Sequence, residues 1–380
     1  MNNTFTPLPS RTPPGNTIGF VGWLRQNLFS SWGSSLFTIF GIYLLLQFIP
    51  PAVQWFFLDA TWGGSDRSGC ETEINGETAD APGACWTFIR VRAAQMFFGL
   101  YFASHADQIW RPILMFVLFF AMLIPLLLPM VARKIKNAIG LVLIFIFPIV
   151  AYSLLDGSWL GMPVAHSSEW GGFLLTFILA SVGIVAAFPI SVVMALGRRS
   201  EMPIIRSICV FYIEIWRAAP LITILFMASN LLPLFFPSGV NYDKVARALI
   251  AITLFQSAYM AEAIRGGLQA IPKGQFEGAD SLGLGYWQKT IFIVLPQALK
   301  ISIPGLVNSA LQLFKDTALV GIIGLHDFLE ITKVASRSPE WIGYDFEGLI
   351  FVSIFYFIFC YAMSKYSQGL ERKLDTGHKT

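Results

Sequence analysis

The sequence predicts an all-α fold, a polytopic membrane bundle of about eight transmembrane helices. Of its 380 residues, 55% are hydrophobic and only 13% are charged, against about 25% charged residues in an ordinary soluble domain. The apolar residues gather in long runs, and the charged residues form short clusters between these runs. Such clustering is typical of segments that cross a membrane. The formal net charge of +3 gives no indication of a nucleic-acid partner.

The clearest predicted span lies between Arg111 and Arg133, where 21 residues (112–132) carry no charge. At about 1.5 Å per residue, this stretch covers the roughly 30 Å hydrocarbon core of a bilayer. A helix is expected because it satisfies all the backbone groups of a single segment inside lipid. The same reasoning predicts further spans at residues 35–57, 138–155, 172–196, 208–232, 245–264, 300–324 and 348–366.

The distribution of Lys and Arg predicts the orientation of the spans, because positive residues near span ends stay on the cytoplasmic side. Basic residues follow the second, fourth and eighth spans: Arg133, Lys134 and Lys136; Arg198, Arg199 and Arg206; and Lys365, Arg372 and Lys373. The intervening loop, residues 157–171, has neither Lys nor Arg. We therefore expect both termini in the cytoplasm. Residues 1–34 are expected to be a flexible tail, residues 35–169 a three-span extension and residues 371–380 a second tail.

The first external loop, about residues 58–111, contains Cys70 and Cys85. An oxidising exterior would permit a disulfide between them, and the alternative is two free thiols. After Cys85, aromatic residues mixed with Arg90 and Arg92 suggest an amphipathic helix at the outer membrane interface. A docking surface for another subunit is the alternative interpretation.

The chain becomes polar directly after the predicted span at residues 245–264. Phe276, Ala279 and Leu282 recur at helical spacing with polar residues between them, which predicts a short amphipathic helix over about residues 275–285. Gly283 is expected to end this helix, because glycine readily adopts the backbone conformation that closes a helix.

This segment resembles the membrane subunits of bacterial ABC importers, whose cytoplasmic signature is Glu-Ala-Ala, three residues, Gly, nine residues, then Ile, any residue, Leu-Pro. The matching residues here, at the same spacing, are Glu277, Ala279, Gly283, Ile293, Leu295 and Pro296. Only Gly278 departs from the signature, which has Ala there. Glycine lowers helix propensity by about 1 kcal/mol but keeps the helix surface small.

In that family the short helix is the coupling helix, which sits in a groove of a separate cytoplasmic ATPase. The resemblance implies that this ATPase is contacted by Glu277, Gly278, Ala279, Asp280 and Gly283. Glu262 and Arg265, at the membrane exit, are expected to brace the coupling segment. The alternative is a helix that lies on lipid headgroups, but such helices favour Lys and Arg on their polar face, and this one is acidic.

Further runs, at residues 216–221, 258–275 and 315–319, resemble the polar amino-acid (histidine/glutamine-type) branch of these permeases. The resemblance covers roughly residues 170–370, which it identifies as the five-helix core of a type I ABC importer. The preceding spans resemble the larger permeases of general L-amino-acid importers. The resemblance implies import of polar L-amino acids across a bacterial inner membrane. It also implies two ATPases that bind ATP and Mg²⁺, an external solute-binding protein and a second permease subunit, either a similar chain, which we favour, or a second copy.

Ionisable residues inside membrane spans are costly and usually face a cavity or a partner group. Four such residues in the predicted spans are singled out: Glu214, Arg217, Lys315 and Asp316. With Thr317, they are predicted to line the substrate pathway, because a zwitterionic amino acid needs donors for its carboxylate and acceptors for its ammonium. Glu214 and Arg217, three residues apart, share a helix face and are candidates for an ion pair. The alternative is that these residues form only structural ion pairs.

No Gly-rich loop followed by Lys-Ser/Thr occurs in the chain, so ATP hydrolysis is expected in another polypeptide. The four histidines lack zinc-ligand spacing, and no Ser, Cys or His constellation suggests catalysis, so neither a metal nor an enzymatic activity is expected. Two alternatives to an ATP-driven importer remain. One is an ion-coupled secondary transporter or channel, and the other is a membrane scaffold whose cytoplasmic helix recruits a regulator.

Overall fold

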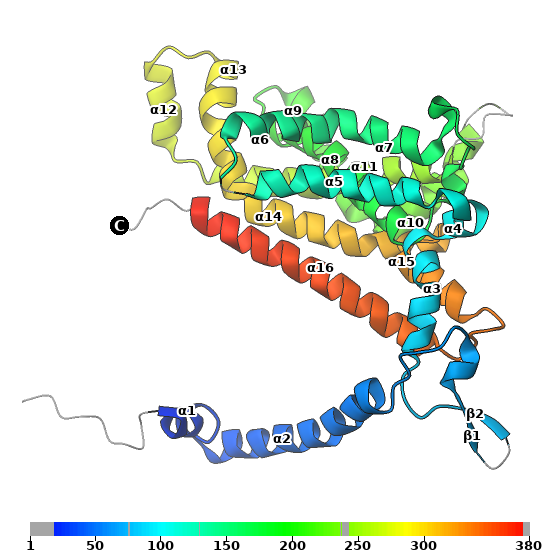
Figure 1. Ribbon diagram of the computed structural model, residues 1–380. Helices are drawn as coiled ribbons and strands as arrows, with labels where there is room; N and C mark the ends of the chain where they lie inside the picture. Colours follow the sequence, from blue (N-terminus) through cyan, green and yellow to red (C-terminus); the bar gives the residue numbers. More distant parts are fainter. Residues whose placement is uncertain (1–18, 75–76, 129, 236, 238–242, 375–380) are drawn as a thin grey trace, which may run out of the picture. The chain divides into compact units, whose positions relative to one another are not determined.

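The computed structural model describes residues 19–74, 77–128, 130–235, 237 and 243–374 (Figure 1). Contacts within the chain divide it into two compact units, Met1–Thr87 and Phe88–Thr380. Helices dominate both units, and the strands of the described residues form one two-stranded hairpin in the first. The predicted all-α class is therefore confirmed.

The first unit begins with the helices α1 (Gly19–Asn27) and α2 (Trp32–Val53), and α2 continues as the π-helical segment η2 (Gln54–Leu58). The Ser31 hydroxyl caps α2 by accepting a hydrogen bond from the Ser34 amide. The expectation of a flexible tail over residues 1–34 is wrong for residues 19–27, because these form α1. Residues 1–18 of the expected tail lie outside the described residues.

A disulfide closes the loop that follows α2. It joins Cys70, at the end of the 3₁₀ turn η3 (Arg67–Cys70), to Cys85, and both cysteines are buried. Between them, β1 (Glu71–Ile74) pairs antiparallel with β2 (Glu77–Asp80). The bridge spans 15 residues of sequence, and a loop of that size corresponds to about 3 kcal/mol of stabilisation through the restricted unfolded chain.

The segment predicted to lie at the membrane interface forms α3 (Trp86–Phe98) and α4 (Leu100–Ser104). The ring of Phe97, near the end of α3, lies 5.9 Å from that of Phe173 and 5.6 Å from that of Phe355. A helix is therefore present as predicted, but this part of its apolar side packs against protein. Aromatic pairs at these distances stabilise a packed core beyond their area burial.

A fully buried arginine fixes the start of α5 (Trp110–Leu127), which follows the short turn η4 (Ala106–Gln108). The Arg111 guanidinium donates hydrogen bonds to the carbonyl oxygens of Pro163 (2.8 Å) and Leu155 (3.4 Å). Leu155 lies in the last turn of α7 (Phe147–Asp156), where a positive charge interacts favourably with the helix dipole. From the sequence, Arg111 marked only the edge of a predicted span. α6 (Arg133–Leu141) and η5 (Val142–Ile146) connect α5 to α7.

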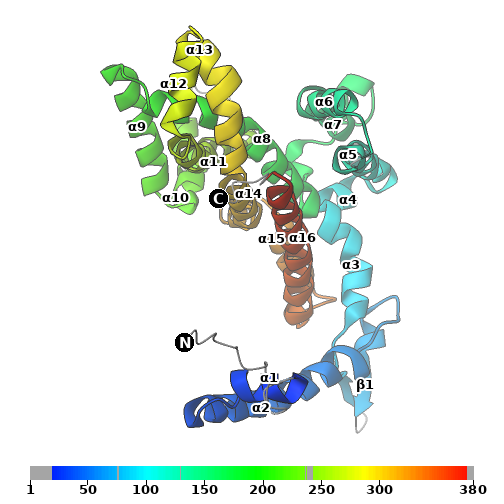
Figure 2. The same ribbon diagram turned by 90° about the vertical axis from the view of Figure 1, so that its left-hand side faces the viewer.

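The rest of the second unit is the helical core. After the turns η6 (Ser158–Leu160) and η7 (Ser167–Glu169), its elements are α8 (Gly172–Arg198), α9 (Pro203–Ala218), α10 (Leu221–Phe226), η8 (Met227–Leu231), η9 (Leu232–Phe235), α11 (Lys244–Gln269), α12 (Lys273–Ser281), α13 (Tyr286–Lys289), η10 (Thr290–Val294), α14 (Leu295–Asp316), η11 (Thr317–Ile323), α15 (Phe328–Ser336) and α16 (Asp345–Leu374). α11 lies at the centre, in contact with α8, α9 and α14 (Figure 2). Its buried residues, such as Ile252 and Ile264, join two apolar clusters that hold these helices together.

Six helices of the described residues are long and apolar enough to cross a membrane: Trp32–Leu58, Ala106–Leu127, Arg133–Asp156, Gly172–Arg198, Tyr286–Ile323 and Asp345–Arg372. They overlap with six of the predicted spans. The prediction of one continuous span over residues 208–232 is wrong, because α9 and the segment Leu221–Phe235 are bent by 99°. Pro220 stands at this break and lacks the N–H that would continue the helix. The remaining prediction, residues 245–264, falls within α11, which is long enough but more polar.

Within the second unit, α12, the first turn of α6 and the C-terminal end of α16 lie toward the same end, and the loop after α7 lies at the other (Figure 1). This arrangement agrees with the alternation of basic and uncharged loops in the sequence. Because the structure contains no membrane, the side on which each end lies stays a prediction.

Candidate functional site

The predicted coupling segment forms α12, which begins after Pro272 and ends at Ser281. Gly283 then adopts the left-handed region, with φ of 69°, and the Leu284 amide donates a hydrogen bond to the Ala279 carbonyl (3.3 Å). This closure uses glycine where other residues would be strained. The helix therefore begins two residues earlier than predicted and ends at Ser281, before the predicted end near residue 285, and Gly283 closes it as expected.

The two faces of α12 differ in exposure. Glu277, Gly278 and Asp280 are exposed, and no basic side chain of the described chain lies within ion-pair distance of Glu277. Ala279, in contrast, is only 2% exposed. The Ala279 side chain packs inside the chain in this conformation, and its contribution to ATPase docking stays a prediction. Glu277 is the acidic group that remains free for a partner.

Three contacts hold α12 against the bundle. The Arg199 guanidinium lies 5.7 Å from the centre of the Phe276 ring and also donates a hydrogen bond to the Leu268 carbonyl (2.7 Å). Asp280 forms an ion pair with Lys289 of α13. The amide of Gln297, in α14, donates to Gln275 (2.9 Å). From the sequence, Arg199 counted only as a signal of orientation, yet it connects the end of α8 to α12.

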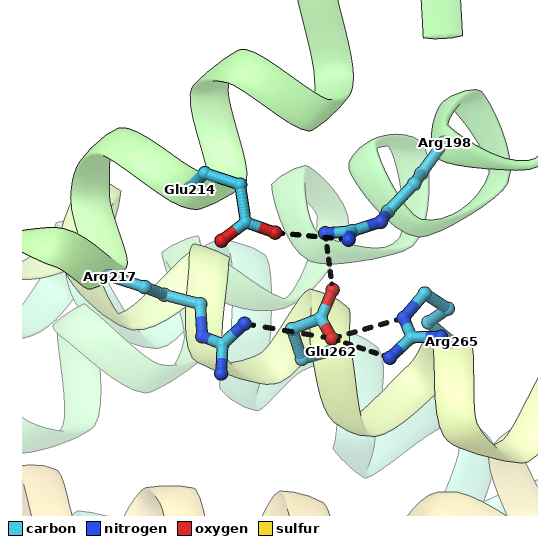
Figure 3. A network of polar contacts seen from close by, with 5 residues as sticks. All are labelled: Arg198, Glu214, Arg217, Glu262 and Arg265. Carbon is cyan, nitrogen blue, oxygen red and sulfur yellow. Dashed lines mark hydrogen bonds and ion pairs between the residues drawn. The ribbon is translucent and has the colours of Figure 1, made fainter. Parts of the chain in front are cut away.

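A carboxylate surrounded by arginines joins α8, α9 and α11 (Figure 3). Glu262, whose side chain is 15% exposed, accepts from Arg198 at 2.7 Å and from Arg265 at 2.8 Å. Arg217 lies farther away, at 3.6 Å, and its guanidinium is also 5.6 Å from the Tyr259 ring centre. We call these residues, together with Glu214, the Glu262 cluster. Because it contains three arginines and two glutamates, it carries an excess of one positive charge.

The cluster changes the pairing that was expected from sequence. Glu214 binds Arg198 of α8 at 3.0 Å, and the closest carboxylate to Arg217 is that of Glu262. The expected Glu214–Arg217 ion pair is therefore replaced by contacts between helices. Arg198 was missed as a site residue because its partners lie on other helices. Glu262 and Arg265 do pair with each other, and their role in bracing the coupling segment stays a prediction.

No ion pair of the described residues joins the predicted residues of the seventh span to the Glu262 cluster. Lys315 is exposed and Asp316 is half-buried at the C-terminal end of α14. Thr317 is fully buried, and its hydroxyl donates to the Phe314 carbonyl (2.8 Å). In this conformation Thr317 therefore contributes to packing and does not offer a free donor to a substrate. No metal-binding group of three or more His, Cys, Asp or Glu residues occurs in the described parts of the chain.

Known proteins with similar sequences identify the family. The profile of the binding-protein-dependent transport system inner membrane component matches residues 187–375. The inner membrane amino-acid ABC transporter permease protein YhdY of Escherichia coli (strain K12) is 45% identical over 369 residues, which cover 97% of each chain. The chain belongs to the family of amino-acid ABC transporter permeases.

Two further proteins are similar to this chain. The permease BztC of Rhodobacter capsulatus, named for glutamate, glutamine, aspartate and asparagine transport, is 37% identical over 427 residues, with 98% of each chain covered. A solved amino acid ABC transporter with histidines is 28% identical and covers 60% of this chain and 97% of its own, with a TM-score of 0.48. The family predicted from the sequence is confirmed. As an amino-acid ABC transporter permease, the chain is a membrane subunit of an importer whose ATPase is a separate subunit.

Proposed function

We propose that this permease imports polar L-amino acids and that α12 is the coupling helix through which a separate ATPase drives it. The observation that carries the proposal is the exposed, acidic face of α12 on a helix whose opposite face is buried. A free carboxylate such as that of Glu277 can form a charge-assisted hydrogen bond with a basic side chain of the ATPase. The contacts of the buried face fix the orientation of α12 against the bundle.

The contacts of α12 provide a route for mechanical coupling. Arg199 connects it to the end of α8, and Gln297 connects it to the start of α14. A displacement of α12 by the ATPase would therefore move both helices, and α11 lies between them. Packed helices respond by discrete rigid-body shifts, since close-packed interiors do not deform continuously.

Three kinds of partner complete the proposed importer. Two ATPases bind ATP and Mg²⁺, an external solute-binding protein delivers the amino acid, and a second permease subunit completes the pathway. We favour a similar but different chain for this second subunit over a second copy of this one. The proposed location is the bacterial inner membrane, with both termini in the cytoplasm.

Glu214, Arg217, Lys315 and Asp316 are the proposed contacts for substrate. They offer both signs of charge within membrane-spanning helices, and a zwitterion needs both. The names of the relatives, which refer to amino acids and in one case to glutamate, glutamine, aspartate and asparagine, support a polar substrate.

The substitution Glu277→Lys tests the coupling role. It reverses the charge of the exposed face of α12, so we expect loss of ATPase co-purification and of ATP-dependent uptake in proteoliposomes, while the permease stays folded. Glu371→Lys is the matched control, because Glu371 is an exposed acid near the C-terminal end of α16, at the same end of the unit. Unchanged ATPase association in the Glu277 variant would contradict the role of α12. Uptake driven by an ion gradient without ATP would instead support a secondary transporter.

A further inference from the structure

One face of α14 is polar and exposed although the helix belongs to a membrane-spanning segment. Asn308, Gln312 and Lys315 are all exposed, and their spacing of four and three residues places them on one side of the helix. The opposite side packs inside the core through buried residues such as Ser302 and Leu313. We call the three exposed side chains the α14 polar stripe.

The α14 polar stripe differs from the apolar surfaces of the second unit, which are compatible with contact to lipid. On α5, the exposed side chains at comparable spacing are apolar: Ile113, Val117, Phe120 and Ile124. These residues also line a shallow apolar groove. Such a face is compatible with hydrocarbon chains, which offer no hydrogen bonds. Two amides and an ammonium group on one helix face are not compatible with them.

The charge of Lys315 is a further reason why this face of α14 is not compatible with lipid hydrocarbon. No carboxylate of the described residues lies within ion-pair distance of its ammonium group, although Asp316 is its neighbour in sequence. A lysine charge inside a membrane costs several kcal/mol unless it reaches water or an anion. The Lys315 side therefore needs an aqueous environment or an anionic ligand.

We infer that the α14 polar stripe lines the aqueous part of the transport route and determines which amino acids pass. This inference rests on the proposed function and deepens it. Lys315 binds the carboxylate of the substrate, and the amides of Asn308 and Gln312 contact the substrate side chain. An amide offers both a donor and an acceptor, so it accommodates side-chain amides, hydroxyls and carboxylates. The positive charge of Lys315 disfavours lysine and arginine as substrates. The preferred class is therefore neutral polar and acidic amino acids.

Cysteine labelling tests whether water reaches the α14 polar stripe. The free cysteines Cys209 and Cys360 are first replaced by alanine. In this background, Asn308→Cys and Gln312→Cys are treated with a charged methanethiosulfonate in proteoliposomes that contain the full importer. We expect rapid labelling that glutamine slows. The matched controls Val117→Cys and Phe120→Cys, on the apolar face of α5, are expected to react only with an uncharged thiol reagent.

Competition between substrates tests selectivity. Gln312→Glu places a carboxylate at the position assigned to contact the substrate side chain, where it repels the side-chain carboxylate of glutamate and still accepts a hydrogen bond from the amide of glutamine. We expect the ratio of glutamate to glutamine uptake to fall about tenfold. Gln288→Glu is the control, because Gln288 lies on α13 and its side-chain oxygen caps that helix, a role that Glu retains.

The outcomes separate this inference from the proposed function. If the stripe cysteines resist the charged reagent, or if Gln312→Glu leaves the uptake ratio unchanged while wild-type uptake still requires ATP, the stripe does not line the route and only the inference fails. Burial of the stripe by lipid would give this result. If the wild-type protein shows no ATP-dependent uptake, the proposed function fails. Labelling that substrate slows, with an altered uptake ratio, supports both.

Discussion

Three guanidinium groups, from three helices, approach the carboxylate of Glu262. Its side chain is 15% exposed, so water compensates poorly for a lost contact. We predict that Glu262→Gln lowers the free energy of unfolding by about 2 kcal/mol, between the values typical of exposed and buried ion pairs. The melting temperature of the purified permease in detergent measures this loss.

The ion pair of Arg92 and Glu340 provides the control for this prediction. Its atoms are equally close, at 2.7 Å, but the Glu340 side chain is 75% exposed. Glu340→Gln is therefore expected to cost less than about 1 kcal/mol. Equal losses in the two variants would show that burial of the Glu262 cluster does not matter for stability.

Asp327 makes the stability of the second unit depend on pH. Its carboxylate is buried and caps α15 by accepting hydrogen bonds from the amides of Leu329 (3.0 Å) and Glu330 (3.1 Å). Burial raises the pKa of Asp327 to about 6, although these two bonds oppose the shift. Because the folded pKa exceeds the unfolded value of about 4, the protonated acid favours folding, and this stabilisation is lost as the pH rises from about 4 to 6.

The variant Asp327→Asn isolates this effect, since the amide keeps an oxygen for the cap and cannot ionise. We expect the wild-type protein to lose about 3 kcal/mol more stability than the variant across this pH range, as two pKa units imply. Melting temperatures between pH 4.5 and 7.5 measure the difference. Parallel profiles for the two proteins would mean that Asp327 titrates normally in the folded state.

Local sequence patterns predict individual residues only where their partners are close in sequence. The Glu262–Arg265 pair follows from a three-residue spacing on one helix. The same rule suggested a Glu214–Arg217 pair, yet Glu214 binds Arg198, which lies on a different helix. The rule fails there because it contains no information on how α8 packs against α9. Periodicity grouped Ala279 with Leu282 on one apolar face of α12, yet only Ala279 is buried and Leu282 is exposed.

At the scale of elements, a single glycine sets the distance between α11 and α14. A methyl group added at Gly267 would collide with the Ala298 carbonyl oxygen and the Ser302 hydroxyl. At the neighbouring Gly266, no atom lies within 4 Å of the added methyl group. We predict that Gly267→Ala destabilises the permease by about 3 kcal/mol through overpacking against the backbone of α14.

Gly266→Ala is expected to have the opposite sign, with a gain of up to about 1 kcal/mol from helix propensity. The pair is compared by melting temperature and by the fraction of monodisperse protein after extraction. Because the two positions are adjacent on one helix, expression level and lipid environment do not account for a difference in stability between the two variants. Equal destabilisation of both variants would contradict a close contact between α11 and α14.

Hydropathy predicted the straight helices well because a long apolar run determines them directly. It gave the positions of α5, α8 and α16, which need no knowledge of tertiary contacts. The break between α9 and α10 was not predicted, because Pro220 is compatible either with a kinked span or with a sharp bend of 99°. The short helix α1 was also not predicted, because nine residues give too little periodicity to distinguish a helix from a polar tail.

At the scale of the whole molecule, the two ends of the second unit are expected to lie on opposite sides of the membrane. The loop between α7 and α8 contains the exposed Val164, and the loop between α8 and α9 contains the exposed Glu201. The 27-residue helix α8 separates these loops, and a helix of this length exceeds the roughly 30 Å hydrocarbon core. Since only the second loop is basic, the positive-inside rule predicts that Glu201 lies in the cytoplasm.

Labelling of single cysteines in spheroplasts tests this orientation. In the background without Cys209 and Cys360, a membrane-impermeant maleimide is expected to label Val164→Cys at once and Glu201→Cys only after permeabilisation. Gln288→Cys, which follows α12, should behave like Glu201→Cys. The reverse pattern would put α12 outside the cell, where no ATPase could bind it. α11, which precedes α12, packs along α8 and finishes at the same end of the bundle. The proposed role of α12 as a coupling helix therefore requires that Glu201 is cytoplasmic.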